Sequence, residues 1–155
     1  MPIATQGFPI IGGAVLITAL LYLFGWPCVA TIALAVTVFI VSFFRDPTRA
    51  VTADASAIVS PADGRSIRIA AVHDDRFLHG EATLVNIFMS PLNVHVNRVP
   101  VDGTITAIRY NPGKYFRAFA DKASLDNEQN AIVMQTTQGR TLAFVQIAGF
   151  IARRI

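Results

Sequence analysis

The sequence predicts a two-part protein: an N-terminal membrane hairpin of apolar helices, followed by a soluble domain made mainly of β-strands. Residues 1–44 contain no Asp, Glu, Lys or Arg, and all 13 basic and 10 acidic residues lie in residues 45–155. The charge-free part holds apolar runs of about the length of membrane helices. The charged part alternates apolar and polar residues with the period of a strand. This distribution excludes an entirely soluble protein. The lack of a long uncharged run in residues 45–155 also excludes a polytopic transporter.

Two apolar runs fill the first part, residues 8–24 and residues 26–44, with a Gly-Trp-Pro break at residues 25–27. About 20 apolar residues cross the roughly 30 Å hydrocarbon core of a bilayer as a helix. The second run, of 19 residues, is long enough on its own, and the first, of 17 residues, is marginal. Either both runs form a hairpin that places Trp26 at a membrane interface, or the first lies shallow and only the second crosses. We favour the hairpin.

The residues that flank the apolar runs predict the orientation. Arg45 and Arg49 follow the second run directly, and basic residues next to a membrane helix favour the cytoplasmic side. We therefore expect residues 45–155 to face the cytoplasm from the inner membrane.

A cleaved signal peptide is disfavoured because the N-terminus has no basic residue and the apolar region is about twice the usual length. The lone cysteine, Cys28, lies within an apolar run and excludes an intrachain disulfide.

The soluble part is predicted to comprise an extended linker at residues 45–59 and a β-rich domain at residues 60–155. We expect this domain to be a small barrel or sandwich with few helices. The linker is rich in proline and small residues and has no helical period. Residues 138–140 suit a turn with glycine between two strands, and only residues 116–127 suit a short helix. The predicted strands cover residues 66–71, 84–89, 93–97, 104–108, 131–137 and 141–147.

Asp63 is the first candidate for chemistry, because it lies in the turn Ser60–Gly64 just before a predicted strand. An aspartate before glycine commonly caps a turn through its own side chain. The same carboxylate could instead orient a histidine or accept a proton. The turn alone favours the capping role.

His95 is the second candidate. If residues 93–97 are extended, Asn93, His95 and Asn97 share one face of the strand. An imidazole titrates near neutral pH and can carry a proton in either direction, so this polar face could line a cleft. The alternative is a solvated edge strand.

The remaining polar motifs carry less weight. The turn Asn111–Lys114 offers one cation, and His73 and His79 lie in a stretch that suits a solvated loop. We expect no metal, because the histidines lack the spacing of a metal site. We expect no nucleic acid as a partner, because Lys and Arg do not cluster with aromatic residues.

Four short motifs stand in order along the chain: Phe43–Pro47 (FFRDP), Ser60–Gly64 (SPADG), Met89–His95 (MSPLNVH) and Asn111–Lys114 (NPGK). Behind an apolar N-terminal segment, and with this spacing, the sequence resembles phosphatidylserine decarboxylase in its short bacterial and archaeal form. The resemblance covers nearly the whole chain. Each motif alone is weak, but the four together are specific.

The resemblance implies a pyruvoyl-dependent lyase of phospholipid biosynthesis that is made as a proenzyme, or zymogen. In this family a serine of a Gly-Ser pair attacks the preceding carbonyl, and autocatalytic cleavage turns that serine into the pyruvoyl group. The pyruvoyl ketone forms a Schiff base with the amine of phosphatidylserine and accepts the electrons released when carbon dioxide leaves. The product is phosphatidylethanolamine.

The resemblance also implies roles for three residues. Asp63 matches the aspartate that assists self-cleavage together with a base, and His95 matches a histidine suited to proton transfer. Where the longer bacterial form has a second histidine, this sequence has Arg98. Either the usual assignment of an Asp-His-Ser triad does not hold for this chain, or His95 serves both steps. Arg98 is then a candidate to bind the carboxylate or phosphate of the lipid.

None of the ten glycines precedes a serine. The resemblance therefore implies that the pyruvoyl-forming serine lies outside these 155 residues, and that the chain corresponds to a truncated proenzyme or to most of the large β-subunit. We expect the chain alone not to release carbon dioxide. The expected partners are phosphatidylserine in the membrane, a small pyruvoyl-bearing α-subunit and further copies of the chain in a homo-oligomer. The alternative is a non-catalytic, membrane-anchored β-module that binds a lipid or a protein.

Overall fold

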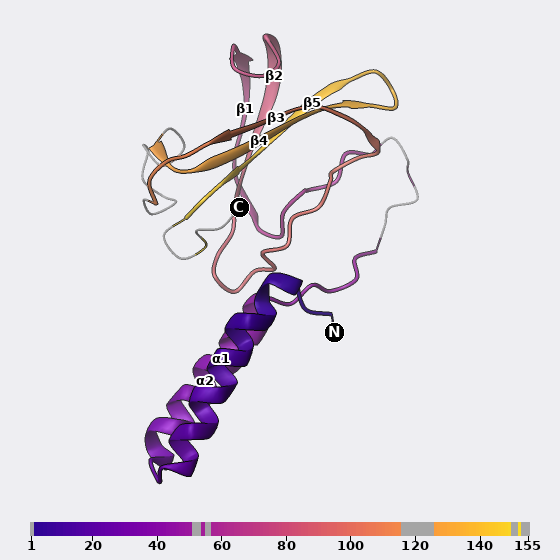
Figure 1. Cartoon of the computed structure of the whole chain (residues 1–155). Coiled ribbons are helices and arrows are strands. Elements are labelled where there is room, and N and C mark those ends of the chain that lie inside the picture. The colour runs from indigo at the N-terminus through magenta and orange to yellow at the C-terminus, as the bar shows by residue number, and fades with distance from the viewer. Residues whose placement is uncertain (1, 51–53, 55–56, 116–125, 150–151, 153–155) are drawn as a thin grey trace. The chain divides into compact units, whose positions relative to one another are not determined.

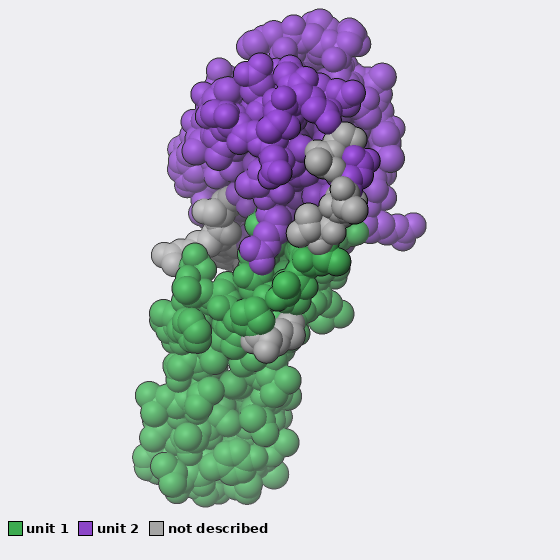
Figure 2. Space-filling view, turned by 90° about the vertical axis from the view of Figure 1, so that its right-hand side faces the viewer, with its two compact units in different colours: residues 1–51, 62–64, 89–97 green, residues 52–61, 65–88, 98–155 purple. Residues whose placement is uncertain are grey.

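The computed structural model describes residues 2–50, 54, 57–115, 126–149 and 152. The chain forms two compact units, which are coloured separately in Figure 2. The first contains residues 1–51, 62–64 and 89–97, and the second contains residues 52–61, 65–88 and 98–155. The first unit thus combines the apolar N-terminal part with two short segments from much later in the sequence. These two segments carry Asp63 and His95.

Two apolar helices pack side by side in the first unit (Figure 1). A 3-10 turn, η1 (Thr5–Gly7), leads into α1 (Phe8–Leu23), and α2 spans Pro27–Phe43. The segment Thr5–Leu23 has 19 residues and is long and apolar enough to cross a membrane. The expectation that the second run is long enough to cross on its own, with the first only marginal, is wrong: α2 has 17 residues and is shorter than the segment Thr5–Leu23. Trp26 is non-helical, with φ −106° and ψ 61°, and Pro27 begins the helix.

The turn between the helices is made by Gly25, whose φ of +76° is a conformation that favours glycine. Beyond it, the two helices are joined by hydroxyl groups. The Oγ1 atoms of Thr18 and Thr37 lie 3.0 Å apart, and both side chains are buried. Each Oγ1 also lies within 2.9 Å of the carbonyl oxygen four residues earlier, on Ala14 and Ala33. Because a hydroxyl has one hydrogen, one threonine donates to the other, and the second donates within its own helix.

We expect Thr18→Val and Thr37→Val each to lower the free energy of unfolding of the hairpin by about 0.6–1.7 kcal/mol. The double variant should lose less than the sum, because both single changes remove the same bond. Chemical unfolding of the chain in detergent, followed by helix content, measures all three losses. Strictly additive losses would contradict a shared hydrogen bond.

The N-terminal residues pair with the segment that leaves α2. The N–H of Ala4 donates to the carbonyl of Phe44, and the N–H of Asp46 donates to the carbonyl of Pro2, both at 2.9 Å. These bonds form an isolated antiparallel bridge between Ile3 and Arg45. The N-terminus and the exit from α2 therefore lie together at one end of the hairpin, on the side of the Asp63 and His95 segments.

The second unit is built from antiparallel β-sheet, which confirms the prediction of a mainly β soluble part (Figure 1). A two-stranded sheet has the order β1-β2, and a three-stranded sheet has the order β3-β4-β5. The arginine in the turn after β1 donates to the sheet, since Arg76 Nη2 lies 3.3 Å from the Oε1 atom of Gln129. The strands span Arg65–Asp74 (β1), Gly80–Phe88 (β2), Gly103–Asn111 (β3), Gln129–Thr136 (β4) and Thr141–Ile147 (β5).

The central strand β4 supplies most of the buried side chains of this unit, including Ala131, Val133 and Met134, which is 1% exposed. The predicted strand at residues 84–89 overlaps β2, which begins earlier, at Gly80, and ends at Phe88. Exposed and partly buried residues alternate along most of β2. The predicted turn at residues 138–140 is confirmed, with Gly139 at φ +78°. The predicted helix at residues 116–127 lies almost wholly outside the described residues.

Candidate functional site

Asp63 is joined to the segment that carries His95. Its Oδ2 atom accepts a hydrogen bond from the backbone N–H of Val94 at 2.8 Å, although the two residues are 31 positions apart. The side chain of Asn93 also bonds to this carboxylate. Asp63 is therefore more than a local turn cap, because it ties the Ser60–Gly64 turn to the residue that precedes His95. This juxtaposition was not visible in either motif alone.

These bonds keep Asp63 ionised. The Val94 N–H is the largest cause that lowers the pKa of Asp63 below its ordinary value of 3.8, and desolvation opposes it. The Asn93 side chain and the guanidinium groups of Arg49 and Arg45 lower the pKa further. At neutral pH the site therefore contains a carboxylate rather than a carboxylic acid.

The segment 93–97 is not a strand, so the expectation of a strand there is wrong. It begins with a turn in which the N–H of Ser90 donates to Asn93 Oδ1 at 2.8 Å. Its carbonyl oxygens are then bonded by side chains instead of by a neighbouring strand. Arg45 Nη2 donates to the Leu92 carbonyl at 2.7 Å, and Arg49 Nη2 donates to the Val96 carbonyl at 3.2 Å.

His95 is partly buried, which excludes the alternative of a solvated edge strand. Its ring stacks on Phe43, the last residue of α2, with centroids 4.1 Å apart and an interplanar angle of 24°. His95 Nε2 is buried and has no hydrogen-bond partner among the described residues, and the same holds for Asn97 Oδ1. A buried polar atom without a partner is rare in folded proteins, so these two atoms suit a group that this chain itself does not supply.

The pKa of His95 is lowered from its ordinary value of 6.5, chiefly because burial disfavours the charged ring. The positive charge of Arg45 acts in the same direction. The carbonyls of Ser90 and Pro91 and the charge of Asp63 oppose it. His95 is therefore neutral at neutral pH and has one ring nitrogen that can accept a proton.

The other predicted residues are placed elsewhere. Arg98 belongs to the second unit, where it is exposed, and its backbone N–H donates to the carbonyl of Pro61 at 2.8 Å. His73 is exposed, as expected, but it lies in strand β1 and not in a loop, with Nδ1 2.9 Å from Glu81 Oε1. Lys114 forms a parallel bridge with Asn127. The structure thus brings Asp63 and His95 together and gives Lys114 a place in the β-structure.

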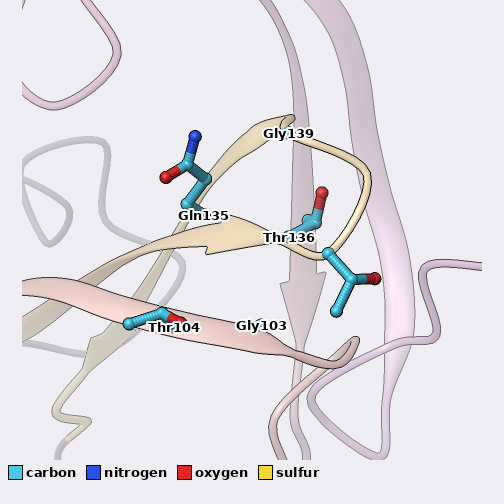
Figure 3. Close-up of a pocket in the computed structure, with 6 residues that line it drawn as sticks. Gly103, Thr104, Gln135, Thr136 and Gly139 are labelled. Carbon is cyan, nitrogen blue, oxygen red and sulfur yellow. The ribbon is translucent and has the colours of Figure 1, made fainter.

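A shallow open depression lies on the second unit, between β3 and the turn that joins β4 to β5 (Figure 3). Gly103 lines it, and a Cβ atom at this position would lie 2.3 Å from the carbonyl oxygen of Gln135. Only glycine allows this close approach of the two strands. The lining residues are Gly103, Thr104, Gln135, Thr136, Thr137 and Gly139. None of them titrates near neutral pH, so the depression does not suit proton chemistry.

Comparison with known proteins decides the family. The family model of phosphatidylserine decarboxylase matches residues 36–155. The chain is 44% identical over 154 residues to a phosphatidylserine decarboxylase proenzyme from Syntrophotalea carbinolica. It is 47% identical over 154 residues to one from Solidesulfovibrio magneticus. It is 45% identical over 156 residues to one from Ralstonia pickettii. These matches cover 99% of this chain and 71–72% of each relative.

The chain belongs to the phosphatidylserine decarboxylase family. The predicted function is confirmed at this level: phosphatidylserine decarboxylases are membrane-associated lyases of phospholipid biosynthesis that are made as proenzymes and generate a pyruvoyl group by self-cleavage. The residues of this chain fit such a group, because the buried Nε2 of His95 and Oδ1 of Asn97 offer polar atoms with no partner among the described residues. The family explains the order of the four motifs, and the structure adds the contacts among them.

Composition and periodicity do not single out three residues of the site. In the sequence, Phe43 lies near the end of an apolar run, and Arg45 and Arg49 are interpreted as charges that orient a membrane helix. Their contacts with His95, Leu92 and Val96 join positions about 50 residues apart, which periodicity cannot predict. Only the family motif that includes Phe43 and Arg45 pointed to this segment.

Proposed function

We propose that His95 and Asp63 handle the protons of self-cleavage and of phosphatidylserine decarboxylation. The observation that carries this proposal is the hydrogen bond from Val94 to Asp63, which fixes the residue before His95 against a carboxylate. The neutral ring of His95 suits a base, and its buried Nε2 atom has no hydrogen-bond partner among the described residues. Asp63 orients the segment and favours the imidazolium when the ring takes up a proton.

When present, the pyruvoyl group supplies the electron sink for loss of the lipid carboxylate. The residues of this chain do the rest. With the ring proton on Nδ1, His95 Nε2 accepts a proton from a hydroxyl and returns it later as an acid. Asn97 Oδ1, which has no partner among the described residues, can accept a hydrogen bond from a group outside this chain. Phe43 covers one face of the imidazole and keeps water from it.

The membrane arrangement belongs to the same proposal. We infer that α1 and α2 form a hairpin in the inner membrane, that residues 45–59 act as a linker, and that residues 60–155 form a barrel-like or sandwich-like domain in the cytoplasm. The shared end of the hairpin supports this, because it places the N-terminus, Arg45 and the Asp63 turn on one side. An enzyme anchored in this way meets phosphatidylserine in two dimensions. A small α-subunit bearing the pyruvoyl group and a homo-oligomeric assembly complete the proposal.

The test uses a completed protein, in which the chain is joined to the part of the Syntrophotalea carbinolica relative that lies outside the match. The completed protein, reconstituted in vesicles that contain carboxyl-labelled phosphatidylserine, is expected to split into two chains and to release labelled carbon dioxide. The same vesicles with the 155-residue chain alone are the control. If the completed protein splits but releases no carbon dioxide, the non-catalytic β-module is the better account.

Arg98 is proposed to bind the carboxylate or phosphate of the lipid. In the completed protein, Arg98→Gln is expected to raise KM for phosphatidylserine about 10-fold to 100-fold with little change in kcat, since a hydrogen bond to a charged group contributes about 1.5–3 kcal/mol. Arg68→Gln, at an exposed position of β1, is the matched control. A fall in kcat at constant KM would assign Arg98 to another step.

A further inference from the structure

We propose that the C-terminal end of helix α2 is part of the site, with Phe43, Arg45 and Arg49 as positioning residues that hold the His95 segment. The inference rests on the proposed role of His95. It means that the hairpin does more than tether the enzyme, because its last turn and the residues after it support the group that moves protons.

Phe43 supports the ring of His95 from one side. The two rings are stacked at 4.1 Å, so the imidazole has one face against a residue fixed by helix α2. Phe44 then packs against Phe43 edge-on, with centroids 5.3 Å apart and planes at 77°. A Cβ atom on Gly7 would lie 2.5 Å from Phe44 Cγ, so Phe44 is packed directly against η1. This continuous packing connects His95 to the N-terminal turn of the hairpin.

The arginines support the backbone on both sides of His95. Both terminal nitrogens of the Arg45 guanidinium donate hydrogen bonds. Nη1 donates to the Ser42 carbonyl at 2.7 Å, and Nη2 donates to the Leu92 carbonyl, also at 2.7 Å. Arg49 donates to the Val96 carbonyl at 3.2 Å. A planar guanidinium with several donors suits such bridging better than a lysine does. The segment is thus held three residues before His95 and one residue after it.

The backbone around Arg45 is itself fixed. Ala4 and Pro2 bond to Phe44 and Asp46 on its two sides, each at 2.9 Å. Arg45 is therefore anchored through its flanking peptide groups as well as through Ser42. Replacing the hairpin by an unrelated membrane helix would keep an anchor but would lose these contacts.

The charged groups that act on His95 are Arg45, which disfavours the charged ring, and Asp63, which favours it. Burial against Phe43 also disfavours the charged ring. Loss of Phe43 or Arg45 should therefore make His95 easier to protonate. Loss of a residue that contributes only to membrane anchoring should leave the protonation of His95 unchanged.

The test is an NMR titration of the histidine rings in the 155-residue chain, held in lipid nanodiscs. Phe43→Leu and Arg45→Gln are each expected to move the His95 midpoint upwards, towards 6.5. The matched controls are Phe39→Leu, at an exposed position one turn earlier on α2, and Arg68→Gln on β1.

The same two variants in the completed protein are expected to lower kcat about 10-fold to 100-fold at unchanged KM, because misplacement of a reacting group costs rate rather than affinity. Two outcomes would overturn the inference. One is a His95 midpoint that Phe43→Leu and Arg45→Gln leave unchanged. The other is an Arg45→Gln variant that loses only its affinity for anionic vesicles, which would make the arginine a headgroup contact.

The titration needs no catalysis, so it separates this inference from the proposed function. If the midpoint moves but His95 variants of the completed protein still turn over, the supporting contacts are real and the proposed role of His95 is wrong.

Discussion

Replacing His95 by alanine in the completed protein is expected to slow both chain splitting and release of carbon dioxide by about 10²–10⁴-fold, the usual contribution of a positioned acid or base. The reason is local: Nε2 of His95 is the one buried ring nitrogen left without a partner among the residues that the structure describes. His95→Gln should be nearly as slow, since an amide cannot transfer a proton near neutral pH. Gel analysis of chain splitting and labelled carbon dioxide measure the two rates separately.

His73→Ala is the control for this substitution, because His73 is exposed and bonds to Glu81. It should leave both rates unchanged. If His95→Ala slowed splitting alone, and an already split variant decarboxylated normally, His95 would serve the proenzyme step only. If neither rate changed, the proposed role of His95 would be wrong.

The second large effect is expected at Asp63. Asp63→Asn can still accept the hydrogen bond from the Val94 N–H, but it lacks the charge that favours a protonated His95. We expect it to lower both rates by about 10²-fold, at the low end of general acid-base contributions, and to lose the stability that the charge contributes in the folded state. Asp63→Ala removes the bond as well, and an unpaired N–H on the buried residue Val94 costs about 1–3 kcal/mol.

The two variants therefore separate charge from positioning. Steady-state activity measures the effect of the charge on the two rates, and unfolding in denaturant measures the loss of stability. Because the folded pKa of Asp63 is lowered, its stabilising effect is present above its ordinary value of 3.8 and is lost as pH falls through the folded value. The free energy of unfolding of Asp63→Asn should therefore lack the part of the pH dependence that comes from Asp63. Equal rates for Asp63→Asn and the unchanged protein would show that the charge is not needed.

Much of the fold could be predicted because it depends on local pattern. The break at residues 25–27 marks the turn of the hairpin, and the strand at residues 141–147 has the bounds of β5. Helix lengths were less accurate. The non-helical Trp26 shortens α2 at its start, and the 3-10 turn at Thr5–Gly7 lengthens the first helical segment. Neither effect changes the pattern of apolar residues, so that pattern could not predict the helix ends.

The site could be predicted only in part. The residue types of Asp63 and His95 predict proton transfer, and Asp63 bonds to the residue before His95 in the structure. The segment that carries His95 looked like a strand because its polar and apolar residues alternate. Its carbonyls instead accept hydrogen bonds from Arg45 and Arg49. Such bonds between distant side chains and backbone leave no periodic trace in a sequence.

The pH dependence of self-cleavage tests the central claim most directly, namely that a neutral, partly buried His95 acts as the base. In the completed protein, the rate of chain splitting should fall on the acid side with a midpoint below 6.5, because the pKa of His95 is lowered. Arg45→Gln should move this midpoint upwards. In His95→Gln the remaining slow splitting should no longer depend on pH in this range. An acid limb that stays in place in both variants would contradict the claim.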